Sequence, residues 1–182
     1  MSGSAASDKM VILDRDGTLV VDRGYVDEAA GLEFTPGAAE ALMWLFAHRY
    51  RLVVITNQSG VGRGFFSLDR VEKVNARLCE MVESLGVRLE RIYFCPHSPD
   101  DGCICRKPAA GLLTRAAQDL GFSPHRAVVI GDKESDIEFG RRAGAKTILI
   151  AGDPAMPLVH IKPDEVCSNL LDAARAVTSH GW

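Results

Sequence analysis

The chain lacks an excess of basic charge, and this absence removes several classes of partner. Its 21 Lys and Arg residues are balanced by 24 Asp and Glu residues, which gives a formal net charge of −3 over 182 residues. Nucleic-acid-binding domains usually carry a basic stripe, and surface binding to anionic lipids also needs clustered cations. We therefore expect neither nucleic acid nor a membrane as a partner.

Long apolar runs are also missing. No stretch is long enough to span a bilayer, and residues 1–8 contain no apolar segment of the kind found in secretory signals. These absences predict a flexible tail at 1–8 and a soluble, cytoplasmic protein. Internal repeats are missing too, so a single domain over residues 9–182 is the default expectation for this length.

Cysteine is scarce, with five residues, and an odd number without a secretory signal argues against a disulfide framework. Cys95, His97, Cys103 and Cys105 form the pattern C-x-H-x5-C-x-C within eleven residues. Three thiolates and one imidazole make a complete tetrahedral set for Zn²⁺ with no open position. The pattern predicts a structural zinc that pins a polar loop, and a chance cluster is the less favoured interpretation.

Short apolar runs alternate with segments of helical periodicity. Strands are expected near residues 11–13, 52–56, 92–95, 127–130 and 147–150. Helices are expected from Pro36-Gly37 to about Arg49, from an N-cap at Ser67 toward Leu85, from a first turn containing Pro108 to just before Gly121, and near 170–174, where a short terminal helix would pack against the sheet edge. This alternation predicts an α/β protein with a doubly wound parallel sheet.

Two carboxylates stand two residues apart where the first expected strand ends. The run Asp14-Arg15-Asp16-Gly17-Thr18 follows four apolar residues. One carboxylate at this spacing can attack phosphorus, the other can carry the leaving group's proton, and together they can bind a hard divalent cation. For the pentapeptide alone, a polar strand-to-loop turn is an equally good interpretation.

Three more polar segments follow the next expected strands, and in doubly wound sheets ligands bind at that edge. They are Thr56 and its glycine-rich continuation, the loop from Cys95 to Lys107, and Gly131-Asp132-Lys133. All four segments should therefore converge on one crevice.

In this order the four segments resemble the motifs of the haloacid-dehalogenase (HAD) superfamily of phosphatases. The matches are D-R-D-G-T at 14–18, Thr56, Lys107 and G-D-K-E-S-D at 131–136. The resemblance implies a capless, Rossmann-like α/β fold and an aspartyl-phosphate mechanism. It implies Asp14 as nucleophile, Asp16 as acid and base, Thr56 and Lys107 as further catalytic residues, and Mg²⁺ held by Asp14, the Asp16 backbone carbonyl and Asp132. Asp136 could orient that site.

A narrower resemblance joins the chain to the D-glycero-D-manno-heptose 1,7-bisphosphate 7-phosphatases of bacterial heptose and lipopolysaccharide-precursor synthesis. It lies in residues 22–26, in 56–64 and in the Cys/His loop through Pro108. It implies Mg²⁺-dependent removal of the C7 phosphate, a phosphorylated sugar as partner, and a structural zinc. The residues that it implies for substrate binding are Asp22, Arg23, Gly24, Tyr25, Asn57, Gln58, Ser59, Arg106 and, more weakly, Arg63.

Several alternatives stay open at this point. The related histidinol-phosphate phosphatases share the Cys/His loop, so histidinol phosphate or another sugar phosphate could be the substrate. A non-catalytic phosphate-binding or zinc-scaffold module is the alternative outside enzymes, and it would have no need of a nucleophile. The residues do not choose between the α and β anomers of the heptose, and a mixed surface charge pattern makes a monomer the default.

Overall fold

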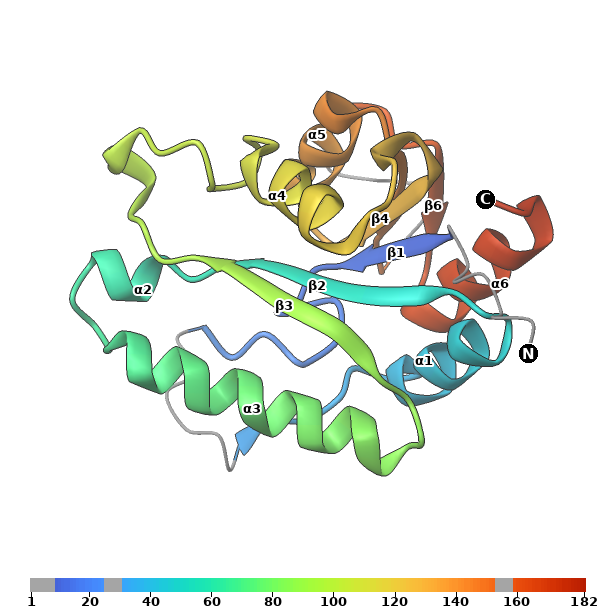
Figure 1. Ribbon diagram of the computed structural model, residues 1–182, viewed down its shortest axis with the longest axis horizontal. Coiled ribbons are helices and arrows are strands. Elements are labelled where there is room, and N and C mark those ends of the chain that lie inside the picture. The colour runs from blue at the N-terminus through green and yellow to red at the C-terminus, as the bar shows by residue number, and fades with distance from the viewer. Residues whose placement is uncertain (1–8, 25–30, 153–158) are drawn as a thin grey trace.

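A parallel β-sheet forms the centre of the molecule (Figure 1). The computed structural model describes residues 9–24, 31–152 and 159–182, so the tail predicted at 1–8 lies outside the described residues. Within them, six strands pair in the order β3-β2-β1-β4-β5-β6, every neighbouring pair parallel. Their bounds are β1 Met10–Leu13, β2 Arg51–Asn57, β3 Leu89–Cys95, β4 Ala127–Gly131, β5 Lys146–Ile150 and β6 Glu165–Cys167.

Helices cover both faces of this sheet, with α4 and α5 on one side and α1, α3 and α6 on the other (Figure 1). Their bounds are α1 Ala38–Ala47, α2 Ser59–Gly62, α3 Leu68–Ser84, α4 Gly111–Leu120, α5 Glu134–Ala143 and α6 Leu170–His180, with 3-10 turns at Pro99–Asp101 and Pro124–Arg126. Across the described ranges, no helix combines the length and apolarity needed to cross a membrane.

The central strands β1 and β4 are buried at every position, because helices cover both faces of the sheet there. Along β1, Val11 and Leu13 pack into the core beneath α1, α3 and α6, whereas Met10 and Ile12 pack beneath α4 and α5. Successive side chains of a strand point to opposite faces, so one short run supplies both cores. The predicted doubly wound parallel sheet is confirmed.

Three details differ from the sequence-based expectations. The edge strand β6 has only three residues and was not predicted, because so short a segment carries no periodic signal. The helix expected from Pro108 begins at Gly111, although it ends before Gly121 as predicted. The terminal helix α6 packs over a face of the sheet beside α1, and β6 occupies the edge.

Candidate active site

The strand order places four polar segments at one point. From β1 the chain moves outward through β2 and β3 and then returns to β4 on the other side of β1. Ligands bind in such sheets at the carboxyl ends of the strands where the order reverses. Asp14 follows β1 directly, and its N–H donates to the Ile130 carbonyl at 3.0 Å, which joins the ends of β1 and β4. The predicted convergence at this edge is therefore present.

A buried ion cluster lies at the centre of the crevice. The Lys107 Nζ atom is 2.5 Å from Asp14 Oδ1 and 2.6 Å from Asp136 Oδ1, and it donates to the Ile55 carbonyl at 2.8 Å. Three acceptors match the three N–H donors of the ammonium group. Because all three charged side chains are buried, this pairing offsets the loss of their hydration.

The cluster changes the protonation of its members. Burial raises the pKa of Asp14 to about 6; the Lys107 charge opposes that rise, and the Asp136 charge adds to it. Burial would lower the pKa of Lys107, but the charges of Asp136 and Asp14 outweigh burial and raise it. Lys107 therefore stays a cation beside Asp14 at physiological pH.

The side chain of Asn57 holds the backbone of Lys107. Its Nδ2 donates to the Lys107 carbonyl at 3.0 Å, and its Oδ1 accepts from the Lys107 N–H at 3.0 Å. Asn57 is the last residue of β2. The two hydrogen bonds therefore fix Lys107, which follows Cys105 by two residues, to the end of a central strand. The resemblance implied that Asn57 binds substrate, whereas in the structure its side-chain amide forms hydrogen bonds with the Lys107 backbone.

Asp16 is held by several donors. Gln58 Nε2 donates to Asp16 Oδ2 at 2.8 Å and also to Thr56 Oγ1 at 2.9 Å. Arg15 adds Nε at 3.1 Å from Oδ1 and a terminal nitrogen at 3.0 Å from Oδ2. Asp16 thus lies beside Thr56 and close to Asp14, as the shared crevice predicts.

Three carboxylates are arranged as a cation could bind them. One oxygen each of Asp14, Asp132 and Asp136 lies within 4.8 Å of the others. Asp136 already accepts from Lys107 and from the Lys133 N–H at 3.1 Å, so both of its oxygens have a donor in the protein. A Cβ at Gly17 would collide with the Asp132 carboxylate, so glycine permits their close approach. An all-oxygen donor set of this kind fits Mg²⁺.

The four residues of the Cys/His pattern also come together. The Cys105 Sγ lies 3.1 Å from Cys95 Sγ, 3.4 Å from Cys103 Sγ and 3.1 Å from His97 Nδ1. Tetrahedral Zn–S bonds separate their sulfurs by about 3.8 Å, so the cluster needs only a small expansion to fit zinc. None of these cysteines is in a disulfide.

A small hollow of about 100 Å³ opens beside Asp16. The predicted residues that line it are Asp16, Asp22, Gly24, Asn57, Gln58 and Ser59. Lys133 also lines it and was not predicted, although it stands inside the fourth motif. Its Nζ lies 3.1 Å from Asp22 Oδ2 and 3.5 Å from the Asp16 carbonyl. The hollow therefore presents both a carboxylate and a cation to a ligand.

The other predicted substrate residues lie in different places. Arg23 pairs with Glu33 at 2.6 Å, and neither Arg23 nor the exposed Arg63 lines the hollow. Tyr25 lies outside the described residues. Arg106 is half-buried, and one of its terminal nitrogens is buried without a hydrogen-bond partner in the described part of the chain. A cationic group in this state suits an incoming anion.

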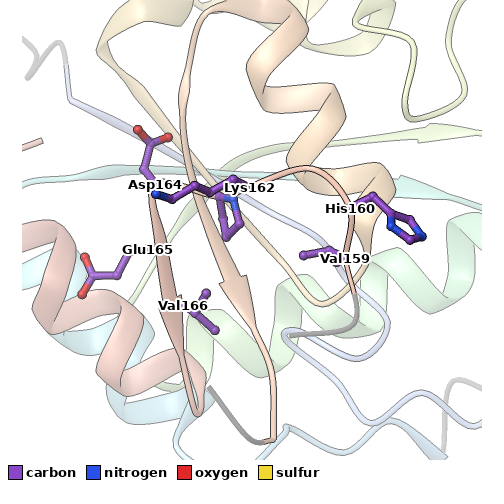
Figure 2. Close-up of a pocket in the computed structure, with 7 residues that line it drawn as sticks. Val159, His160, Lys162, Asp164, Glu165 and Val166 are labelled. Carbon is purple, nitrogen blue, oxygen red and sulfur yellow. The ribbon is translucent and has the colours of Figure 1, made fainter. Parts of the chain in front are cut away.

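A second hollow, of about 340 Å³, lies away from these residues. Figure 2 shows that its lining side chains include Val159 and Lys162 from the segment before β6 and Val166 from β6 itself. It shares no lining residue with the crevice at the sheet edge. We assign it no part in the chemistry.

Comparison with known proteins agrees with this geometry. A HAD-hydrolase-like family model matches residues 104–173. The D-glycero-beta-D-manno-heptose-1,7-bisphosphate 7-phosphatase of Helicobacter pylori strain J99 is 41% identical over 145 residues, covering 79% of this chain and 83% of that protein. The protein of the same name from Haemophilus ducreyi is 38% identical over 173 residues, covering 90% and 95%.

A solved structure gives the same result. The D,D-heptose 1.7-bisphosphate phosphatase from B. bronchiseptica, complexed with magnesium and phosphate, matches with a TM-score of 0.82 at 27% identity. The match covers 94% of this chain and 99% of that one. The chain therefore belongs to the D-glycero-D-manno-heptose-1,7-bisphosphate 7-phosphatase family of HAD-like hydrolases.

Proposed function

We propose that the protein is a phosphomonoesterase that removes the C7 phosphate of D-glycero-β-D-manno-heptose 1,7-bisphosphate. The observation that carries the proposal is the buried contact of Lys107 with Asp14, 2.5 Å long, beside an Asp16 held by four donor atoms. In this proposal Asp14 is the nucleophile, Lys107 the neutralising cation and Asp16 the proton carrier. A binding module would gain nothing from this arrangement.

The proposed reaction has two steps. Asp14 attacks the phosphorus atom, the bond to the C7 oxygen breaks, and Asp16 gives its proton to that oxygen. The resulting aspartyl-phosphate is then hydrolysed by water, from which Asp16 takes a proton back. Lys107 offsets the charge on the phosphoryl oxygens, and a preorganised charge in a dry site is typically worth about 3 kcal/mol.

Mg²⁺ is the proposed catalytic cofactor, and the residues that would hold it are Asp14, Asp132 and the Asp16 backbone carbonyl. When bound, this ion would balance the negative charge of the substrate phosphate and help to align it. An all-oxygen donor set supports this choice of ion over a soft metal.

Zn²⁺ is the proposed structural cofactor, held by Cys95, His97, Cys103 and Cys105. The four donor atoms would complete a tetrahedral shell around this ion and leave no position for substrate. Elemental analysis should find one zinc per chain. Cys103→Ser should lower both the zinc content and the melting temperature, because the loop has few apolar residues to hold it.

For the substrate, the partnerless nitrogen of Arg106 and the exposed ammonium of Lys133 support recognition of an anionic sugar phosphate. The preference for the β anomer rests on the names of the Helicobacter and Haemophilus relatives.

Phosphate release with Mg²⁺ tests the proposal on the α and β heptose bisphosphates, histidinol phosphate and fructose 1,6-bisphosphate. We expect kcat/KM for the β heptose to exceed the others by about a hundredfold, which corresponds to roughly 2.7 kcal/mol of transition-state binding. Better turnover of histidinol phosphate would overturn the substrate and keep the mechanism. Absence of release from every substrate would favour the phosphate-binding or zinc-scaffold module.

A further inference from the structure

Arg15, the residue between the two motif carboxylates, is a buried cation with no assigned task. It is only 2% exposed, whereas arginine is almost never fully buried unless it is paired. Its Nε lies 3.1 Å from Asp16 Oδ1, and one terminal nitrogen lies 3.0 Å from Asp16 Oδ2. The fork of the guanidinium therefore grips the carboxylate on one side.

The other terminal nitrogen of Arg15 reaches a different element. It donates to Asn75 Oδ1 at 3.0 Å, and this hydrogen bond is buried. Asn75 lies on α3 among the buried residues Val71, Val74 and Leu78, and it is 8% exposed. A polar side chain on an apolar helix face needs a partner, and among the described residues Arg15 provides one for Asn75.

The planar guanidinium is thus held at both ends. A hydrogen bond at one terminal nitrogen fixes the plane of the group, and the plane fixes where the opposite edge can meet Asp16. The backbone of Arg15 is fixed too, because its carbonyl accepts from Leu19 N and Val20 N at 3.0 Å each. The orientation of the Asp16 carboxylate is therefore set by contacts that run through Arg15 from Asn75 on α3, outside the crevice.

We propose that Arg15 and Asn75 are positioning residues that hold the Asp16 carboxylate in place for its two proton transfers. The proposal rests on the proposed function, since it assumes that Asp16 moves protons in a phosphatase reaction. Arg15 itself transfers no proton. Its task is to keep Asp16 directed at the leaving oxygen in the first step and at the attacking water in the second.

Asn75→Leu tests this proposal, because it keeps the size of the side chain and removes the acceptor. Two substrates separate proton transfer from the rest of catalysis. The C7 oxygen of the heptose needs a proton to leave, whereas the dinitrophenolate of 2,4-dinitrophenyl phosphate does not. We expect the variant to lose at least tenfold in kcat on heptose bisphosphate and to keep the rate of the dinitrophenolate burst within twofold.

After the burst, steady-state turnover of the aryl phosphate should also fall at least tenfold, since hydrolysis of the aspartyl-phosphate needs Asp16 as base. The burst amplitude should stay near one per active site. A variant that had lost structure would instead lose amplitude. Asn75→Asp keeps an oxygen facing Arg15 and should recover kcat to within about threefold of wild type.

Val71→Ala is the matched control, because it also removes buried atoms from α3 and leaves the Arg15 contact intact. It should lower the melting temperature without the split between the two substrates. An unchanged kcat in Asn75→Leu, or an equal loss in burst rate and heptose turnover, would overturn the positioning role. Failure of the wild type to release phosphate would instead overturn the proposed function.

Discussion

Among single residues, Asp14 has the most direct part in the proposed reaction, because one oxygen of its side chain is the proposed nucleophile. Asp14→Asn removes the charge and nearly keeps the shape, and Lys107 retains Asp136 as an ion partner. We expect loss of at least about a thousandfold in kcat with circular dichroism and melting temperature close to wild type. Turnover retained in a preparation free of other phosphatases would contradict the nucleophilic role.

Asn57 gives a second residue-scale prediction. Its amide holds the Lys107 backbone through two hydrogen bonds, so Asn57→Leu should let the ammonium shift away from Asp14. A shift of about 1 Å near the chemistry can cost roughly a hundredfold in rate. Steady-state kinetics should therefore show a fall in kcat and little change in KM.

The opposite kinetic result would instead indicate that Asn57 contacts the substrate directly. If KM rose and kcat stayed the same, the side chain would be contributing uniform binding of the substrate. Asn57→Asp serves as the matched variant, because it keeps the acceptor for the Lys107 N–H and replaces the donor to the Lys107 carbonyl with a carboxylate oxygen. Its kcat should lie between those of Asn57→Leu and the wild type.

At the scale of elements, the short helix α2 is docked on the Cys/His loop. Gly62 N donates to the Pro96 carbonyl at 2.8 Å, and a Cβ at Gly62 would lie 2.5 Å from Ser98 N. Gly62→Ala must therefore push α2 away from the loop. Because Ser59 and Gly60 of α2 line the hollow, KM should rise several-fold, as measured in steady-state assays.

Gly152→Ala is the matched control for this variant. Among the residues that the structure describes, none has an atom within 4 Å of a Cβ at Gly152, so KM should stay at its wild-type value. An unchanged KM in Gly62→Ala as well would mean that the position of α2 does not shape the hollow.

Asp164 joins two elements at the edge of the sheet. It accepts from Thr147 N at 2.9 Å and from Lys146 Nζ at 3.0 Å, which ties the entrance of β6 to β5. Burial would raise the pKa of Asp164, but the bonds from Lys146 and Thr147 outweigh it and lower the pKa below its usual value. The folded state therefore favours the charged form.

The lowered pKa of Asp164 makes the stability of this sheet edge depend on pH. The stabilisation is complete above the unfolded pKa of about 3.9 and is lost as the pH falls through the lower native pKa. Asp164→Asn should cost about 1 kcal/mol of unfolding free energy near pH 7 and much less near pH 3. Urea unfolding at both pH values measures the difference, and a cost independent of pH would rule out the charge as its source.

At the scale of the whole molecule, we predict a monomer. The net charge of −3 and mixed surface charges favour separate molecules in solution. Sedimentation velocity should give one species near 19.7 kDa. A dimer would contradict this prediction and would direct attention to α1, where Met43, Trp44 and Phe46 are exposed.

Features that depend only on neighbouring residues could be predicted from the sequence. The parallel sheet, the N-cap at Ser67 and the end of α4 at Gly121 follow from local periodicity and caps. The edge strand β6 was missed because its three residues carry no periodic signal of their own. They form a strand because they pair with β5. The roles assigned to individual site residues stay predictions until variants are measured.

Several contacts at the site had no signal in the sequence. Arg15 and Asn75 are sixty positions apart, and only the packing of α3 against the loop after β1 brings them together. Arg23 was expected at the substrate and instead pairs with Glu33, since a charged side chain is not directed by its neighbours in sequence alone. Lys133 could have been found, because it stands next to Asp132 at the end of a central strand.

Apolar periodicity and motif spacing are local properties of the chain, so the class of fold, the family and the available chemical groups could be inferred from the sequence alone. Tertiary structure decided which groups touch. The packing of the elements pairs Lys107 with both Asp14 and Asp136 and places the Asn57 amide in hydrogen bonds with the Lys107 backbone. It also links Asp16 through Arg15 to α3. The physical reason is that burial forces each polar group to find a partner, and that partner is set by the packing of distant elements.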